Sequence, residues 1–233
     1  MSATNRGAQR RSKDDYPTPP NHTRALLTWL KKRGLLPAGC SIVDPCAGAG
    51  AILRVVREQV PDARLIANEL DLGRFEELYE GTLNPDVATF GDALDGAIVG
   101  PGAAMITNFP FSLNDAFIER YVTLDRPFSA AFLPVSYLGS SGRCAGWEAN
   151  PPAHLLMVDQ RPQFVAVCKG FQKTKTTTRI KGCGRMYDIG TRGTCACGGA
   201  IGDGSDAMVY VWAVWIGQTL HEETRWSWLR VPR

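Results

Sequence analysis

Apolar and polar positions alternate along residues 20–133 in two different patterns. Short apolar runs predict buried strands, and stretches with apolar residues three or four positions apart predict amphipathic helices. The predicted strands cover residues 41–44, 64–69, 87–90, 103–107 and 128–133. The predicted helices comprise one capped by Asn21 and ending at Gly34, one through 52–56, one over 72–80 and one over 113–121. Strands and helices in this order predict a doubly wound α/β fold with a mostly parallel sheet.

The alternation ends after residue 137. Residues 137–153 are rich in glycine, serine and proline, and residues 168–206 are rich in glycine and contain no long apolar run. Residues 208–216 then form one continuous apolar run, which predicts a last strand covered on both faces. We therefore expect a basic arm (1–13), an α/β domain (14–165, completed by 208–233) and a cysteine-bearing loop insertion before the last strand (166–207).

Composition narrows the class of protein. Of the 233 residues, 44% are hydrophobic and 21% charged, as in ordinary globular proteins. No stretch is apolar enough to span a membrane, and the N-terminal residues lack the apolar core of a signal peptide, so we expect a cytoplasmic protein without a membrane partner. Basic residues are concentrated in two segments: four in residues 1–13 with no acid, and seven against three acids in residues 166–206. This asymmetry favours an anionic partner, but two solvated surface segments explain it equally well.

The first predicted strand runs directly into the sequence Asp-Pro-Cys-Ala-Gly-Ala-Gly at 44–50. A ligand of an α/β sheet binds at such a strand-to-helix turn, where Gly48 and Gly50 would let the backbone approach it closely. A tight turn alone explains two glycines equally well. The next two strands, however, end on Glu69 and Asp92, which are placed to accept hydrogen bonds from ribose hydroxyls and from an adenine amino group. Because the carboxyl ends of neighbouring parallel strands meet, we expect these groups in one nucleoside-binding crevice.

The fourth strand ends in Asn108-Phe109-Pro110-Phe111. This sequence resembles the Asn/Asp-Pro-Pro-Tyr/Phe motif of the exocyclic-amino methyltransferases, with Phe109 in place of the first proline. By this resemblance, Asn108 and the carbonyl at 109 accept hydrogen bonds from the target amine, and Phe111 stacks on the base. The alternative is a strand-end turn made rigid by Pro110, with the two phenylalanines in the core.

The N-terminal Tyr16-Pro17-Thr18-Pro19 resembles the Tyr-x-Thr-Pro element of DNA adenine methyltransferases, in which Tyr16 and Thr18 would help to wall the cofactor site. Together with the later Arg161-Pro162-x-Phe164, these motifs are most similar to small adenine-specific enzymes of phages and prophages. The resemblance implies a Rossmann-like class I methyltransferase fold. It also implies S-adenosylmethionine as cofactor, held by residues that include Asp44 and Cys46.

We therefore expect methyl transfer from S-adenosylmethionine to N6 of adenine in double-stranded DNA. The target base must be flipped into the pocket formed by residues 108–111, while the basic arm and the basic insertion contact phosphates. Two alternatives remain open. The same chemistry could act on RNA or on a protein glutamine, or the chain could be a nucleic-acid-binding relative that has lost activity through Phe109.

Four of the seven cysteines lie in or at the edge of the glycine-rich insertion, namely Cys168, Cys183, Cys195 and Cys197. Four thiolates can complete a structural zinc site, and a segment with little apolar content has reason to use one. The alternative is a flexible loop with incidental cysteines. His22, His154 and His221 share no spacing typical of metal ligands, so we expect no catalytic role for them.

Overall fold

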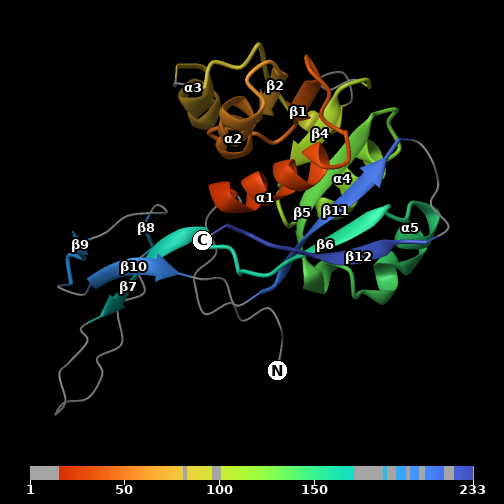
Figure 1. The fold of residues 1–233 in the computed structure, drawn as a ribbon. Helices are drawn as coiled ribbons and strands as arrows, with labels where there is room; N and C mark the ends of the chain where they lie inside the picture. The colour runs from red at the N-terminus through yellow and green to blue at the C-terminus, as the bar shows by residue number, and fades with distance from the viewer. Residues whose placement is uncertain are drawn as a thin grey trace.

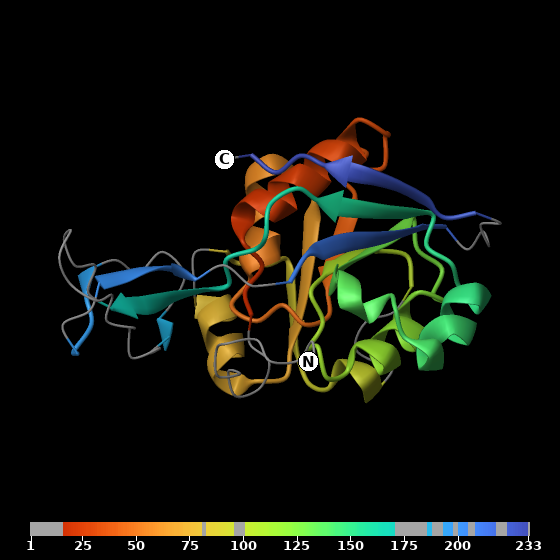
Figure 2. The ribbon, with the colours of Figure 1, turned by 90° about the horizontal axis from the view of Figure 1, so that it is seen from below.

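The computed structural model describes residues 16–80, 83–95, 101–170, 186–187, 193–197, 200–204, 208–217 and 223–232. Most of these residues surround an eight-stranded sheet, and a four-stranded sheet projects from the side of this main body (Figures 1 and 2). Among the described residues, no helix is both long and apolar enough to cross a bilayer.

The main sheet is mostly parallel. Its strands are β1 (Ser41–Asp44), β2 (Arg64–Glu69), β3 (Val87–Phe90), β4 (Ala104–Thr107), β5 (Phe128–Pro134), β6 (His154–Val158), β11 (Tyr210–Ile216) and β12 (Arg225–Leu229). They lie in the order β12-β6-β11-β5-β4-β1-β2-β3, and only β11 runs antiparallel to its neighbours. The strand order reverses between β1 and β4. In open α/β sheets, the crevice outside the carboxyl ends of the strands at such a reversal is where ligands bind.

Helices cover both faces of this sheet. They are α1 (Pro20–Lys31), α2 (Ala51–Gln59), α3 (Leu72–Glu80), α4 (Asn114–Tyr121) and α5 (Cys144–Ala149), with short 3-10 helices η2 (Ala93–Asp95), η3 (Val135–Tyr137) and η4 (Ser141–Arg143). Neighbouring residues of one strand point to opposite faces. Accordingly, Ile42 packs in the core under α1 and α2, whereas Val43 packs in a second core with Phe117 and Tyr121 of α4. The doubly wound α/β fold predicted from the sequence is thus confirmed.

The smaller sheet is formed by residues of the predicted insertion. Its strands are β7 (Val165–Gly170), β8 (Met186–Tyr187), β9 (Gly193–Thr194) and β10 (Ala200–Gly204), in the order β8-β7-β10-β9. The prediction of a loop insertion is wrong for these residues. An antiparallel ladder needs only backbone hydrogen bonds, so β7 and β10 pair from Val165↔Gly204 to Gly170↔Ala200 although β10 contains glycines.

One predicted helix cap is also wrong. Helix α1 begins at Pro20, and Pro19 occupies the cap position without a capping side chain. Proline suits the first turn because its missing N–H would have no helical partner there. Asn21 lies inside the helix, and its Nδ2 donates to the carbonyl of Pro232 at 3.3 Å.

Candidate active site

The loop after β1 has the open backbone predicted for a ligand site. Gly48 has a φ of +55°, and a Cβ added there would meet no atom within 4 Å. This combination leaves space beside the backbone for a ligand. Gly50, with a φ of +83°, is needed for a different reason, because its Cβ would lie 2.6 Å from Leu83 Cδ2 and 2.9 Å from Leu78 Cδ1. Gly50 therefore allows close packing, and Gly48 is the glycine that faces open space.

Glu69 connects the ends of β1 and β2. Its Oε2 accepts the Gly48 N–H at 2.7 Å, and its Oε1 accepts the N–H groups of Leu70 and Asp71 at 2.9 and 2.8 Å. These three bonds fix the orientation of the carboxylate. A carboxylate offers about four acceptor positions, so it retains capacity for a ligand hydroxyl.

Asn68, the residue before Glu69, holds the three strand-end loops together. Its buried side chain donates to the carbonyls of Pro45 at 3.1 Å and Gly91 at 3.0 Å, and accepts from Thr89 Oγ1 at 2.9 Å. No sequence pattern indicates this role, because an asparagine within an apolar strand identifies none of its partners.

The predicted acidic residues do converge on one place. Burial raises the pKa of the Cys46 thiol well above its usual range, and the nearby carboxylates of Asp44, Glu69 and Asp92 raise it further. Asp92 directly precedes η2, and its Oδ1 accepts the Leu94 N–H at 2.9 Å. The three strand ends therefore bring their acidic side chains together around Cys46.

Asp44 links the loop after β1 to the end of β4, which directly precedes Asn108. It is fully buried, and its Oδ1 accepts Thr107 Oγ1 at 2.8 Å and the Cys46 N–H at 3.1 Å. Burial raises the pKa of Asp44 to about 7, although the hydrogen bonds from Thr107 and Cys46 lower it. Thr107 is the last residue of β4, so this hydrogen bond joins the end of β4 to the loop after β1.

Asn108 directly follows Thr107, and a hydrogen bond holds the nitrogen end of its side-chain amide. Its Nδ2 donates to the Tyr16 carbonyl at 2.9 Å. Its Oδ1 is buried and has no hydrogen-bond partner among the described residues. A buried acceptor without a donor is costly, so a donor from a ligand or a water would stabilise it.

The two phenylalanines of residues 108–111 have different surroundings. Phe109 is 1% exposed and stacks on Phe117 with ring centroids 4.7 Å apart, so its side chain has the packing role left open by the sequence. Phe111 is half-buried and stacks on Tyr16 at 5.3 Å, with the rings 21° from parallel. Pro110 holds the turn, and its carbonyl accepts the Leu113 N–H at 2.9 Å.

An aromatic cluster surrounds Phe111. Phe164 lies edge-on to Tyr16 at 5.6 Å and to Phe111 at 6.3 Å, and Tyr210 lies 6.1 Å from Phe111. Phe164 immediately precedes β7, so the smaller sheet is joined to the main body at this cluster. In the sequence, Phe164 was indicated only by the resemblance of residues 161–164 to adenine-specific methyltransferases. No pattern indicated Tyr210.

Two further polar side chains near these loops have unsatisfied atoms. Thr18, predicted to wall the cofactor site, is 2% exposed, and its hydroxyl has no hydrogen-bond partner among the described residues. The same holds for both amide atoms of Asn114, which is 1% exposed and begins α4 three residues after Phe111. Asn114 was not predicted, because its position within a helix carries no chemical signal.

The predicted zinc ligands are only partly described. The Cys195 and Cys197 sulfurs lie 3.4 Å apart, and the backbone of Cys168 lies in β7, which pairs with β10. Cys183 lies outside the described residues, as do the basic arm and six of the seven basic residues of the insertion. Among the described side chains, no group of three or more His, Cys, Asp or Glu could hold a metal.

Comparisons with known proteins identify the fold. No model of a protein family matches the chain. A 54-residue segment, 23% of this chain, is 41% identical to the type II methyltransferase M.XamI of Xanthomonas campestris pv. amaranthicola, but it spans only 10% of that protein.

Two solved structures resemble the whole chain. A Pyrococcus horikoshii protein assigned as an RNA methyltransferase has a TM-score of 0.53 at 15% identity, over 90% of this chain and 93% of its own. The methyltransferase subunit of a type I restriction-modification system of Streptococcus thermophilus has a TM-score of 0.54 at 11% identity, over 93% of this chain and 48% of its own. The chain therefore has the Rossmann-like class I methyltransferase fold.

Proposed function

We propose that this chain transfers a methyl group from S-adenosylmethionine to the N6 amine of adenine in DNA. The observation that carries this proposal is the buried Oδ1 of Asn108. Among the described residues it is an acceptor without a donor, and it follows the strand end where the sheet order reverses. An exocyclic amine is a donor that would satisfy it.

The acidic side chains around Cys46 are proposed to hold the cofactor. Gly48 leaves open space beside its backbone, Glu69 is held ready to accept ribose hydroxyls, and Asp92 lies where it could accept the adenine amine. The Thr18 hydroxyl, unsatisfied within the described residues, can serve the same ligand. When bound, S-adenosylmethionine supplies an electrophilic methyl group attached to its sulfonium.

The residues after β4 would position the target amine. The Tyr16 carbonyl fixes Nδ2 of Asn108, so Oδ1 is the end of the amide that accepts from the amine and directs its lone pair. Phe111 would stack on the base, with Phe164 as an edge-on neighbour. Methyl transfer to an amine depends on such positioning more than on a strong base.

The choice of DNA rests on the identity to the type II methyltransferase and on the sequence resemblance. We propose that a double-stranded target presents its adenine flipped out of the helix. RNA and protein glutamine remain the alternative substrates, because their amines would fit the same acceptor. A relative without activity is the second alternative, since Phe109 replaces the first proline of the motif.

We also propose that Cys195 and Cys197 contribute to a structural zinc site of the smaller sheet. Their sulfurs lie 3.4 Å apart, a spacing that one metal ion could bridge. Cys168 and Cys183 are the remaining proposed ligands. Such a site would stabilise the insertion whose basic residues are proposed to contact phosphates.

The decisive experiment measures transfer of labelled methyl groups from S-adenosylmethionine to unmethylated duplex DNA, to RNA of matched sequence and to a release-factor protein. We expect incorporation into DNA alone, recovered as N6-methyladenine after nucleoside analysis. Incorporation only into RNA or protein would establish the alternative substrates. If no polymer is methylated although S-adenosylmethionine binds, the proposed activity is wrong.

A further inference from the structure

Strand β12 ends the main sheet beside β6, with no further strand on its outer side among the described residues (Figure 1). The Arg225 N–H donates to the Ala153 carbonyl at 3.0 Å, and the Leu229 carbonyl accepts the Asp159 N–H at 3.2 Å. Residues 225, 227 and 229 therefore direct their backbone groups toward β6. Because alternate residues of a strand point their N–H and C=O groups to opposite sides, Trp226 and Trp228 direct theirs outward.

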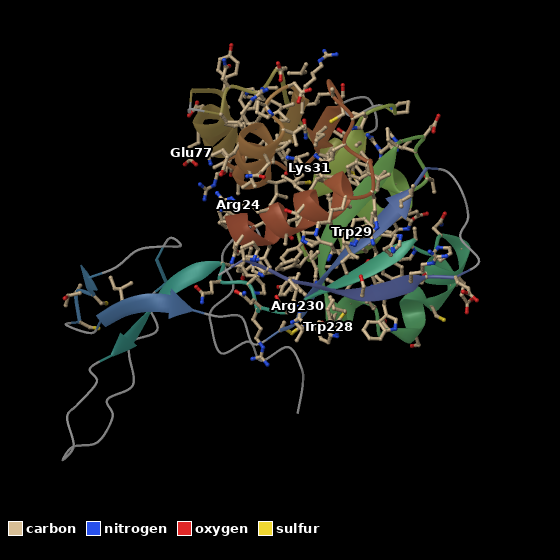
Figure 3. The ribbon with its side chains drawn as sticks, in the orientation of Figure 1. Arg24, Trp29, Lys31, Glu77, Trp228 and Arg230 are labelled. Atoms are coloured by element: carbon tan, nitrogen blue, oxygen red, sulfur yellow. The ribbon has the colours of Figure 1, made fainter. Side chains whose placement is uncertain are left out.

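The side chains of these two tryptophans are also exposed. Trp226 is 67% and Trp228 56% exposed, and their rings meet edge to face at 6.5 Å. In the parallel register they lie next to Leu155 and Met157, which are themselves only half-buried. Helix α5 has six residues and stacks Trp147 on Trp215 of β11, whereas both tryptophans of β12 stay exposed (Trp228 is labelled in Figure 3). Strand β12 thus has both outward-facing backbone hydrogen-bonding groups and an exposed pair of tryptophans.

We infer that this surface binds a second copy of this chain, with β12 of one copy pairing antiparallel to β12 of the other. Pairing centred on Ser227 sets Trp226 opposite Trp228 of the second copy, and Trp228 opposite its Trp226. Residues with outward backbone groups then face each other, as a ladder requires. The two aromatic pairs formed in this way each add to the stabilisation from burial. This inference is independent of the proposed function.

The charges on β12 are compatible with this pairing. Arg225 lies opposite Leu229 of the second copy, so no two like charges face each other. Arg230, whose side chain is 82% exposed despite its ion pair with Asp159, lies diagonally across from Trp226 of the second copy, within reach of a cation–π contact. Self-pairing thus gives each exposed β12 side chain a compatible neighbour.

The size of the patch sets the expected affinity. The exposed surface of the two tryptophans is roughly 300 Å² per copy. A standard interface buries about 800 Å² per partner, so we expect a reversible dimer in the micromolar range.

Cysteine cross-linking tests the register. Ser227 would lie opposite itself as a non-hydrogen-bonded pair with Cα atoms about 4.5 Å apart, within the range of a disulfide. Under mild oxidation, Ser227→Cys should therefore give a covalent dimer. Arg225→Cys is the matched control, because its two copies would lie roughly 13 Å apart along the strands. If both variants and the wild type cross-link equally, the register is wrong.

Sedimentation velocity of the full chain tests the surface itself, at concentrations between about 1 and 100 μM. We expect a monomer–dimer equilibrium that is weakened at least tenfold in the double variant Trp226→Glu, Trp228→Glu. Tyr79→Glu is the control, because Tyr79 is 64% exposed on α3 near the opposite edge of the sheet. A wild type that stays monomeric, or a double variant that dimerises normally, would overturn the inference. So would a monomer whose tryptophan fluorescence is quenched by a single-stranded oligonucleotide, since the surface would then bind nucleic acid.

Discussion

The amide of Asn108 has two ends with different surroundings. Nδ2 donates to the Tyr16 carbonyl, whereas Oδ1 is buried without a partner among the described residues. If Oδ1 accepts the target amine, Asn108→Ala should lower kcat by about 10²–10³-fold, the usual effect of removing one transition-state hydrogen bond. The affinity for S-adenosylmethionine, measured by calorimetry, should stay nearly unchanged. An Asn108→Ala enzyme with full turnover would contradict the mechanism.

Gly48 is the position where a side chain would enter the cofactor space. Gly48→Val should abolish S-adenosylmethionine binding, because a side chain there projects into the space left open beside the backbone. Gly39→Val is a close control, since Gly39 has a φ of +67° and also has no atom within 4 Å of its added Cβ. Both variants carry the same kind of backbone strain. Equal losses of affinity, measured by calorimetry, would show that strain explains the effect.

Glu69 should also contribute to the free energy of S-adenosylmethionine binding. Glu69→Ala removes the acceptor of the Gly48 N–H and of a ribose hydroxyl, so we expect affinity to fall by about 1–3 kcal/mol. Glu77→Ala on α3 removes a carboxylate that is 55% exposed and pairs with Arg74, and this variant should bind S-adenosylmethionine normally. Unchanged calorimetric affinity in Glu69→Ala would mean that the ribose lies elsewhere.

At the level of elements, the sequence predicted the strands that alternate with helices. Strands β1 to β5 and β11 lie within the runs predicted as strands, although β3 is only half-buried. Because Gly48, Glu69, Asp92 and Asn108 end or follow these strands, the candidate site could be located as well. Strands β6 and β12 could not be predicted. His154–Val158 follows a stretch rich in glycine, serine and proline, and the pairing of Arg225–Leu229 depends on β6, which is far away in sequence.

The same limit applies to parts of the site. Asn68 acts through carbonyls of two other loops, and Tyr210 reaches Phe111 only because β11 lies beside β5. Such roles arise from tertiary contacts, and no local pattern encodes them. Strand-end acids and glycines are easier to predict, because sheet topology alone brings them together.

The smaller sheet is the element that we propose a metal stabilises. We predict about one zinc per chain, because structural sites take four protein ligands. The double variant Cys195→Ser, Cys197→Ser should lose the metal and weaken DNA binding with a flatter salt dependence, while S-adenosylmethionine still binds. Cys144→Ser, at an exposed cysteine of α5, should change none of these. If elemental analysis of protein purified without chelators finds no zinc, the cysteines are not zinc ligands.

At the scale of the whole molecule, two buried ionisable groups give stability opposite dependences on pH. Burial lowers the pKa of His22, although its hydrogen bond to the Gln160 carbonyl raises it. The unfolded chain therefore binds this proton more readily, and stability falls as pH drops below about 6.5. Asp44 acts in the opposite direction. Its pKa of about 7 in the fold exceeds the unfolded value of about 3.9, so stability is lost as pH rises between these values.

Asp44→Asn separates the two effects. An asparagine oxygen can still accept the Thr107 hydroxyl, but the variant no longer buries a charge at high pH. Its unfolding free energy should match that of the wild type near pH 4 and exceed it by on the order of 3–4 kcal/mol at pH 8, the equivalent of about three pKa units. Urea unfolding at several pH values gives this difference directly. The acid-side loss from His22 should remain in the variant, because that residue is unchanged. A difference that does not vary with pH would mean that Asp44 does not titrate between these values, and that its effect on stability comes from packing.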